Sequence, residues 1–118
     1  MSDSNKKKRD AGKRQRKALE RRVQSALTTI FDPATPNIDL FNMGMIYDIR
    51  IELPGTVELD LAYSSPAHPG NAGLVEEVES TISELDGIEV CKVNVVTDPP
   101  WTLDRVSDHA RVNMSVVD

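Results

Sequence analysis

The segment SSPAHP, residues 64–69, places a histidine and a proline where an extended strand gives way to an acidic helix. His68 followed by Pro69 suits a helix start, because proline lacks an amide hydrogen and fits the first helical position. Free backbone N–H groups and the helix dipole at such a start favour a reactive or metal-binding side chain. His68 could therefore bind a metal or cluster, or carry a proton. The alternative is a polar loop residue at a helix entry.

The other candidate side chains offer little catalytic chemistry. A protein zinc site needs at least three ligands, and the second histidine, His109, falls late in the last helix, where we expect it at the surface. Ser64 and Ser65 lie near His68, but no G-x-S-x-G turn surrounds them, so they are expected to form turns. Cys91, the single cysteine, sits mid-strand and is predicted to be an inert buried thiol. We therefore expect no enzymatic activity.

A second irregular segment, DPPWTLD at residues 98–104, follows the third predicted strand. Its two prolines fix the approach of Trp101, which could dock a partner or cover the core. Loops that follow parallel strands emerge at one edge of a sheet, where ligand sites are common. We therefore predict a partner- or cluster-handling edge formed by residues 64–71 and 97–104. Its candidate residues are Ser65, His68, Pro69, Asp98, Trp101, Thr102 and Asp104.

Hydrophobic periodicity predicts the elements that position this edge. Apolar residues recur every three to four positions in three segments and every second position in three others. The helices are expected over residues 18–31, 69–85 and 103–110, and the strands over 47–53, 56–63 and 88–96.

The order α-β-β-α-β-α indicates an α+β fold. Clean alternation in the strands implies one wet face, so the helices should cover only the other face of a two-layer sandwich. A crossover through the second helix makes the second and third strands parallel in a small mixed sheet of three strands. Residues 112–118 could add a fourth edge strand. The stretch 34–44 is expected to be a loop, tucked under the core by Ile38, Leu40, Phe41 and Met43.

The chain's 118 residues suit one domain, and its net charge of −5 hides an asymmetry. Residues 1–22 hold ten basic against three acidic residues, net +7, and the remainder is net −12. We predict a basic, disordered arm over residues 1–17 and a single domain over 18–118. Residues 6–22 could bind nucleic acid or an acidic partner, but a solvated tail is favoured because no aromatic side chain is interleaved.

No apolar run approaches the roughly 20 residues of a membrane span. The basic N-terminus lacks the apolar stretch of a secretory signal. We therefore expect a cytoplasmic protein that does not bind membranes.

The chain resembles the metal–sulfur cluster assembly factors (domain of unknown function 59), which include SufT-like and PaaD-like proteins. The resemblance runs from about Leu27 to Met114 and leaves out the basic arm. It rests on five segments, of which the double proline followed by Trp-Thr is the most specific. They are DP at 32–33, NMGMIYDIRI at 42–51, SSPAHP at 64–69, LDGIEVCKVNVV at 85–96 and DPPWTLDRVS at 98–107.

The resemblance implies a non-enzymatic accessory or adaptor role in assembling iron–sulfur clusters or delivering them to client proteins. Family members often carry cysteine before the proline where this chain has His68. Histidine can still bind a metal but lacks the soft sulfur that clusters prefer. We therefore expect no firmly bound cofactor, only a transient iron–sulfur cluster at most, with His68 as the candidate metal ligand. The expected partners are iron–sulfur assembly proteins or client apoproteins, and a homodimer is conceivable. The alternatives are a PaaD-like accessory subunit of a phenylacetate-type oxygenase system and a nucleic-acid-associated domain.

Overall fold

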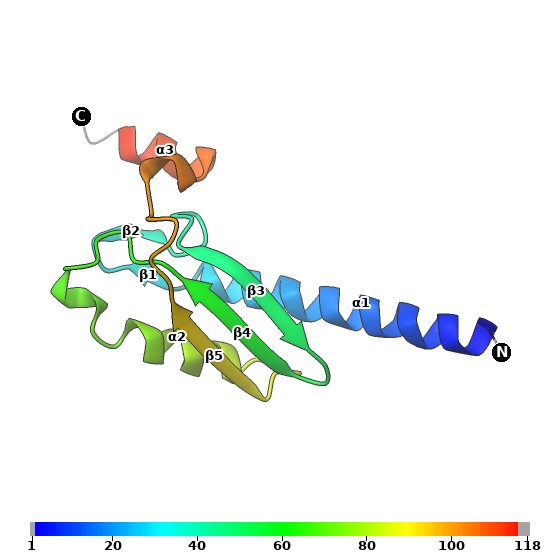
Figure 1. Ribbon diagram of the computed structural model, residues 1–118. Helices are drawn as coiled ribbons and strands as arrows, with labels where there is room; N and C mark the ends of the chain where they lie inside the picture. The colour runs from blue at the N-terminus through cyan, green and yellow to red at the C-terminus, as the bar shows by residue number, and fades with distance from the viewer. Residues whose placement is uncertain (1, 116–118) are drawn as a thin grey trace.

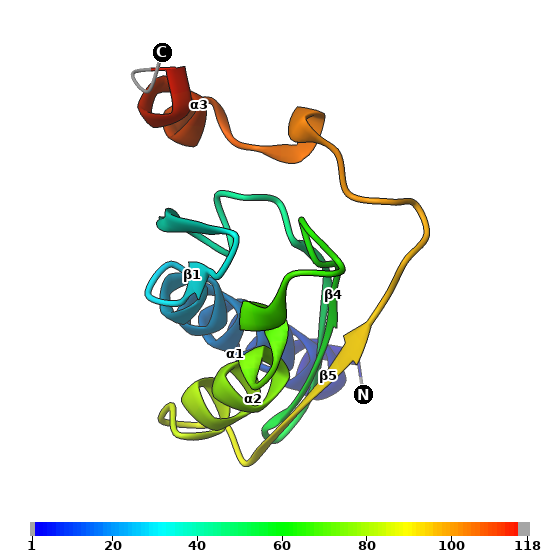
Figure 2. The same cartoon turned by 90° about the vertical axis from the view of Figure 1, so that its left-hand side faces the viewer.

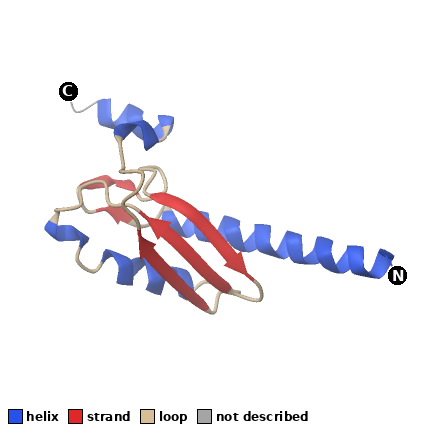
Figure 3. Cartoon of the chain, in the orientation of Figure 1, coloured by secondary structure: helices blue, strands red, loops and turns tan. Residues whose placement is uncertain are grey.

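Two helices lie against one face of a three-stranded sheet and give the molecule two layers (Figures 1 and 2). The structure is a computed structural model that describes the backbone of residues 2–115 and the side chains of residues 5–112. The predicted α+β sandwich is confirmed, and Figure 3 distinguishes its helices from its strands. Its main elements are α1 (Ser2–Leu27), β3 (Ile46–Glu52), β4 (Thr56–Leu61), α2 (Leu74–Ser83) and β5 (Val90–Val95).

The sheet is mixed, with the strand order β3-β4-β5. β3 and β4 form an antiparallel hairpin, and β5 runs parallel to β4, as the sequence predicts. Alternation sends Val57, Leu59 and Leu61 of β4 into the core, where they are fully buried. Each such side chain stabilises the fold by about 1.5–3 kcal/mol, so the inner face holds the sheet to the helices.

α1 and α2 each bury one stripe of apolar side chains at helical spacing. α2 packs on β5, while α1 packs on β3 and on α2. None of the described helices lies on the opposite face of the sheet, and none is long and apolar enough to span a membrane (Figure 2). The buried residues are Leu19, Val23, Ala26 and Leu27 in α1 and Leu74, Val78 and Ile82 in α2.

α1 begins at Ser2, so the prediction of a disordered arm is wrong for the described residues of that segment. Lys, Arg, Gln and Ala are good helix formers. Starting a helix is unfavourable in free energy, and the part of α1 that packs on the sheet overcomes this cost. Each earlier residue only extends the helix that is already formed. The helix leaves the sheet near Gly12, where an added Cβ would lie 3.6 Å from Leu53 Cδ1. Its first turns project beyond the β3–β4 turn (Figure 1).

The stretch predicted as a loop after the first helix contains a short antiparallel hairpin of β1 (Phe31–Asp32) and β2 (Thr35–Asp39). The side chain of Asp32 closes its turn, because Oδ1 accepts a hydrogen bond from the backbone N–H of Ala34 at 3.2 Å. Two prolines concealed this hairpin in the sequence. Of the residues predicted to anchor the stretch, Ile38, Leu40 and Met43 are buried and Phe41 is exposed.

The predicted last helix is split into the short turn η2 (Leu103–Arg105) and α3 (Asp108–Ser115). Ser107 starts α3 as a cap, since its Oγ accepts a hydrogen bond from the N–H of Ala110 at 3.2 Å. The predicted fourth edge strand is wrong for residues 112–115, which belong to α3. Residues 116–118 lie outside the described residues.

The apolar side chains of this last segment are buried only in part. Val106 and Ala110 are buried. Leu103 is 61% exposed, because it begins η2 and not a continuous helix.

Candidate functional site

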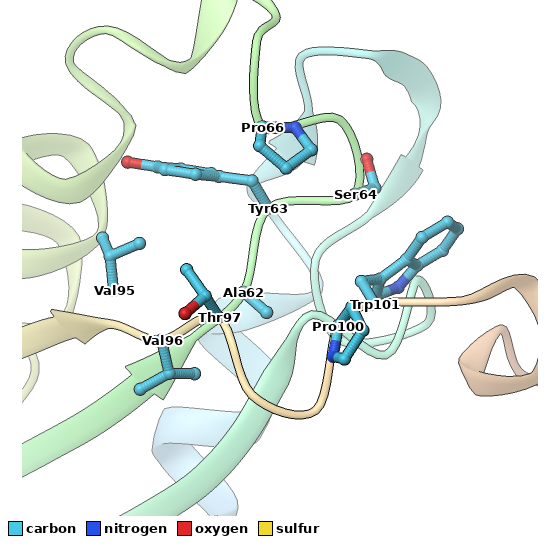
Figure 4. Close-up of a pocket in the computed structure, with 9 residues that line it drawn as sticks. All are labelled: Ala62, Tyr63, Ser64, Pro66, Val95, Val96, Thr97, Pro100 and Trp101. Atoms are coloured by element: carbon cyan, nitrogen blue, oxygen red, sulfur yellow. The ribbon is translucent and has the colours of Figure 1, made fainter.

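The loops that follow β4 and β5 leave the sheet at the same edge, because the two strands are parallel. A pocket of about 200 Å³ lies between them (Figure 4). Small-molecule sites usually exceed about 300 Å³, so this pocket better suits one or two side chains of a partner. The first loop lines it with Tyr63, Ser64 and Pro66, and the second with Thr97, Pro100 and Trp101.

Of the residues predicted for this edge, Trp101 lines the pocket. The structure therefore brings the two predicted loops together, but most of the predicted side chains lie around the pocket and not in it. Those that do not line it are Ser65, His68, Pro69, Asp98, Thr102 and Asp104.

Trp101 is fixed by a hydrogen bond as well as by packing. Its indole Nε1–H donates to the backbone oxygen of Met43 at 2.7 Å. The ring is half-buried and packs against the core. Trp101 therefore forms a rigid wall of the pocket and combines the two roles, docking and covering, that the sequence left open.

The segment after β5 is held against the start of β3 and the loop before it by three further contacts. Arg105 Nε–H donates to the backbone oxygen of Gly44 at 2.7 Å, and the guanidinium lies 3.8 Å from the centre of the Tyr47 ring. The Tyr47 hydroxyl donates to the backbone oxygen of Pro99 at 2.7 Å. Two of the segments that carry the family resemblance, 42–51 and 98–107, thus bind each other and set the pocket's shape.

His68 does not head α2, which begins at Leu74. It caps the single turn η1 (Pro69–Asn71), where its Nδ1 accepts a hydrogen bond from the backbone N–H of Gly70 at 3.0 Å. Gly70 and Gly73 have low helix propensity, which delays the α-helix to Leu74. The predicted helix start at His68-Pro69 is therefore wrong.

This hydrogen bond fixes the chemistry of the His68 ring. A neutral imidazole has one N–H and one acceptor nitrogen, so an accepting Nδ1 places the hydrogen on Nε2. Nε2 then has no lone pair for a metal unless the Gly70 bond is broken. Among residues 5–112, whose side chains the structure describes, no group of three or more His, Cys, Asp and Glu is placed to hold a metal ion.

A buried carboxylate behind the pocket has a structural role that no sequence pattern predicts. Asp32 is fully buried, and its Oδ2 accepts a hydrogen bond from the Ser64 hydroxyl at 2.6 Å. Ser64 lines the pocket, so this bond ties the loop after β4 to the β1–β2 hairpin. The Asp-Pro pair was visible as a family segment, but nothing in its spacing indicated that Ser64 would contact it.

The same hairpin also supports the His68 turn. A Cβ added at Gly70 would lie 2.8 Å from Pro33 Cβ and 2.9 Å from His68 Nδ1. Glycine is needed for this close approach. Asp32-Pro33, Ser64 and the His68 turn therefore form one connected structure beside the pocket.

Cys91 is buried, as predicted. Burial, helped by the Glu79 carboxylate, raises the pKa of the Cys91 thiol from its ordinary value of 9.0 to about 12. Cys91 precedes the pocket residue Val95 by four residues, roughly 13 Å along an extended strand. The thiol is therefore protonated at neutral pH and remote from the pocket.

Known proteins are similar to this chain in sequence. The chain is 27% identical over 99 residues to the Fe–S protein maturation auxiliary factor YitW of Bacillus subtilis, covering 84% of this chain and 96% of that protein. It is 29% identical over 87 residues to the Fe–S protein maturation auxiliary factor SufT of Staphylococcus aureus, covering 74% and 98%.

Solved structures share the fold. A crystal structure of a domain of unknown function 59 from Bacillus anthracis superposes with a TM-score of 0.78 at 25% identity, covering 85% of this chain and 94% of that one. A conserved hypothetical protein from Thermotoga maritima superposes with a TM-score of 0.67 at 27% identity, covering 78% and 89%.

The sequence model of one family, described as iron–sulfur cluster assembly protein, matches residues 20–95. These residues include the β1–β2 hairpin, the whole three-stranded sheet and the His68 turn. The basic residues 6–17 of α1 precede the match. Since the match spans more than half of the chain, this protein belongs to the iron–sulfur cluster assembly protein family.

Proposed function

We propose that this chain is an accessory factor in the maturation of iron–sulfur proteins and works as an adaptor. In this role it holds partner proteins together while the cluster, as cargo, passes between them, and it catalyses no reaction itself. Three of its relatives are named Fe–S protein maturation auxiliary factors. That shared name supports the accessory role. The chemistry of this chain's own residues supports the proposal that it works as an adaptor.

The single observation that carries the adaptor proposal is the hydrogen bond from the Gly70 N–H to His68 Nδ1. Through this bond the His68 imidazole stabilises a turn, at the position where members of the family often have cysteine. The lone thiol of the chain, Cys91, is buried in β5 with a raised pKa. An iron–sulfur cluster is usually held by several thiolates, which the described residues do not offer.

The surface formed by the residues that line the pocket, within 62–66 and 95–101, is here called the pocket edge and has the character of a docking surface. Trp101 and Tyr63 give it large, rigid contact area, and Pro66 and Pro100 keep its two loops stiff. Aromatic residues in partly buried positions are typical anchors of protein interfaces. An apolar side chain of a partner would fill the pocket between the two loops.

The chain offers a matched pair of variants to test this edge. Val95 and Val90 lie near opposite ends of β5 and are 45% and 51% exposed, but only Val95 lines the pocket. Val95→Glu puts a charge into the pocket, and Val90→Glu puts the same charge at the far end of the strand.

The measurement is a pull-down of the tagged full chain from native lysate, with mass spectrometry scored for iron–sulfur assembly proteins and apoproteins. The wild type and Val90→Glu should retain such partners, and Val95→Glu should lose at least about tenfold of the signal, the equivalent of 1.4 kcal/mol. Equal retention by both variants would refute the pocket edge as the docking surface.

A further inference from the structure

A separate surface lies on α1, which carries ten basic residues between positions 6 and 22, here called the basic helix. Arg22 donates a hydrogen bond to the backbone oxygen of Asp86 at 2.8 Å. The other nine are exposed and form no ion pair with any described residue, since the ion pairs among these residues all involve Arg50. They are Lys6, Lys7, Lys8, Arg9, Lys13, Arg14, Arg16, Lys17 and Arg21.

The acidic residues of the domain do not neutralise the basic helix. One carboxylate cluster, Asp48, Glu58 and Asp60, surrounds Arg50 on the outer face of the sheet. The hydrogen bond from Arg50 lowers the pKa of Asp60, and the hydrogen bond from Asn94 lowers the pKa of Glu58, so both are ionised at neutral pH. α1 lies on the opposite face and projects past the β3–β4 turn (Figures 1 and 2).

The composition of the basic helix decides which kind of partner fits it. Between Lys6 and Ala18 the apolar side chains are only those of Ala11 and Ala18. A membrane-surface helix needs a large apolar face, and a protein interface draws most of its affinity from buried aromatic or aliphatic anchors. Neither is available here. A phosphate backbone needs only cations, and their release of counterions drives the binding.

The absence of aromatic residues from α1 also favours a duplex over a single strand as the nucleic acid that it binds. Proteins that bind single strands stack bases on aromatic side chains, and α1 contains no Phe, Tyr or Trp. An exposed α-helix fits the major groove of a duplex. Residues 6–22 extend over about 25 Å at 1.5 Å per residue, which matches roughly seven base pairs.

We propose that the basic helix, residues 6–22 of α1, docks on the phosphate backbone of a nucleic-acid duplex without reading its sequence. This activity is independent of the pocket edge, which lies at the opposite end of the sheet strands (Figure 1). At 100° per residue, eight of the nine exposed cations, all but Lys8, fall on one half of the helix surface, and about four of them face the phosphates at one time.

The test is fluorescence anisotropy of a labelled 20-base-pair DNA duplex of mixed sequence, titrated with the full chain at 50 and 200 mM salt. Four phosphate contacts predict a salt slope near −3.6, which weakens binding about 100-fold between these concentrations. A second mixed duplex should bind equally well, and the separated strand should bind more weakly.

Two single variants provide matched controls. Arg14→Gln removes one cation from the basic helix and keeps a good helix former. It should weaken duplex binding several-fold at 50 mM salt and reduce the magnitude of the salt slope by a few tenths up to one unit. Lys92→Gln removes one exposed cation from β5 and should leave binding unchanged, which separates a local effect from net charge.

Two results would overturn the proposal. One is the absence of duplex binding at 50 mM salt, including the case in which vesicles of anionic phospholipid or an acidic polypeptide bind instead. The other is equal loss of duplex binding in Arg14→Gln and Lys92→Gln. Far-UV circular dichroism of both variants confirms that α1 is intact.

Discussion

The imidazole Nδ1 of His68 lies 3.0 Å from the backbone nitrogen of Gly70 and accepts its hydrogen. The same ring is half-buried beside Pro33 of the β1–β2 hairpin, since both approach the position where a Gly70 side chain would begin. The close approach of Gly70 to Pro33 places the turn after β4 against the segment after α1. The hydrogen bond to Gly70 makes His68 a structural residue of the candidate edge, and this has consequences for stability and for chemistry.

Replacing His68 with Ala should lower the free energy of unfolding by about 0.5–1 kcal/mol, because the turn loses one hydrogen bond whose donor, Gly70, stays accessible to water. His68→Asn should keep most of the stability, since the Asn side chain can accept from the N–H two residues ahead. Urea unfolding of both variants measures the difference. Equal loss in the two variants would mean that the acceptor atom is not what stabilises the turn.

Gly44 should be the least replaceable glycine of the chain. Its φ is +69°, and an added Cβ would collide with the backbone of Arg105. Gly73 has a φ of +87° but open space around it, so Gly73→Ala measures the conformational cost alone, about 1–2 kcal/mol.

Gly44→Ala should cost at least about 2 kcal/mol more than Gly73→Ala, because the segment 98–107 must move away. Thermal or urea unfolding of the pair tests this. If the two variants lose the same stability, the contact between Gly44 and Arg105 does not hold the pocket segment in place.

The pair Asp32 and Ser64 should be strongly coupled. Ser64→Ala leaves a fully buried carboxylate oxygen without its hydroxyl donor, which costs about 1–3 kcal/mol. A double-mutant cycle with Asp32→Ala should give a coupling of at least about 1 kcal/mol. Ser65→Ala, a change of the neighbouring hydroxyl that no described hydrogen bond uses, should stay within about 0.5 kcal/mol of wild type. Additive effects of Ser64→Ala and Asp32→Ala would contradict the coupling.

The raised pKa of Cys91 predicts a dependence of stability on alkaline pH. The folded protein keeps the thiol proton up to about pH 12, while the unfolded chain releases it near its ordinary value of 9.0. The unfolded state therefore binds fewer protons above pH 9, and the free energy of unfolding falls as the pH rises through this window. Cys91→Val should show a shallower fall between pH 8.5 and about 10.5. The same slope in both proteins would mean that the thiol ionises normally in the folded state.

Much of the fold could be predicted from local patterns. Strict alternation in β3 and β4 and the apolar stripe of α2 each depend on residues close in sequence, and the parallel pairing of β4 with β5 follows from the intervening helix. The start of α1 could not be predicted this way. Its basic residues carry no apolar periodicity, and their helix is stabilised by extension from the packed part of α1.

The sequence predicts where the candidate site lies, but not which residues contact one another there. Parallel strands brought the two loops to one edge, as expected. The bonds that shape the edge join residues far apart in the chain: Trp101 to Met43, Arg105 to Gly44 and Ser64 to Asp32. No local sequence pattern predicts such pairs. The sequence predicts that His68 lies at the start of a helix, but Gly70 and Gly73 separate its turn from α2. Their low helix propensity outweighs the preference of Pro69 for the first helical position.

The most direct test of the adaptor is anaerobic reconstitution of the wild-type chain with iron, sulfide and a small thiol, followed by desalting and visible absorbance spectroscopy. Because Nδ1 of His68 is engaged by Gly70 and the only thiol is buried, we predict that no stoichiometric cluster remains on the wild-type protein. A stable cluster on the wild type that persists in Cys91→Val and disappears in His68→Ala would contradict this account and make His68 a true ligand.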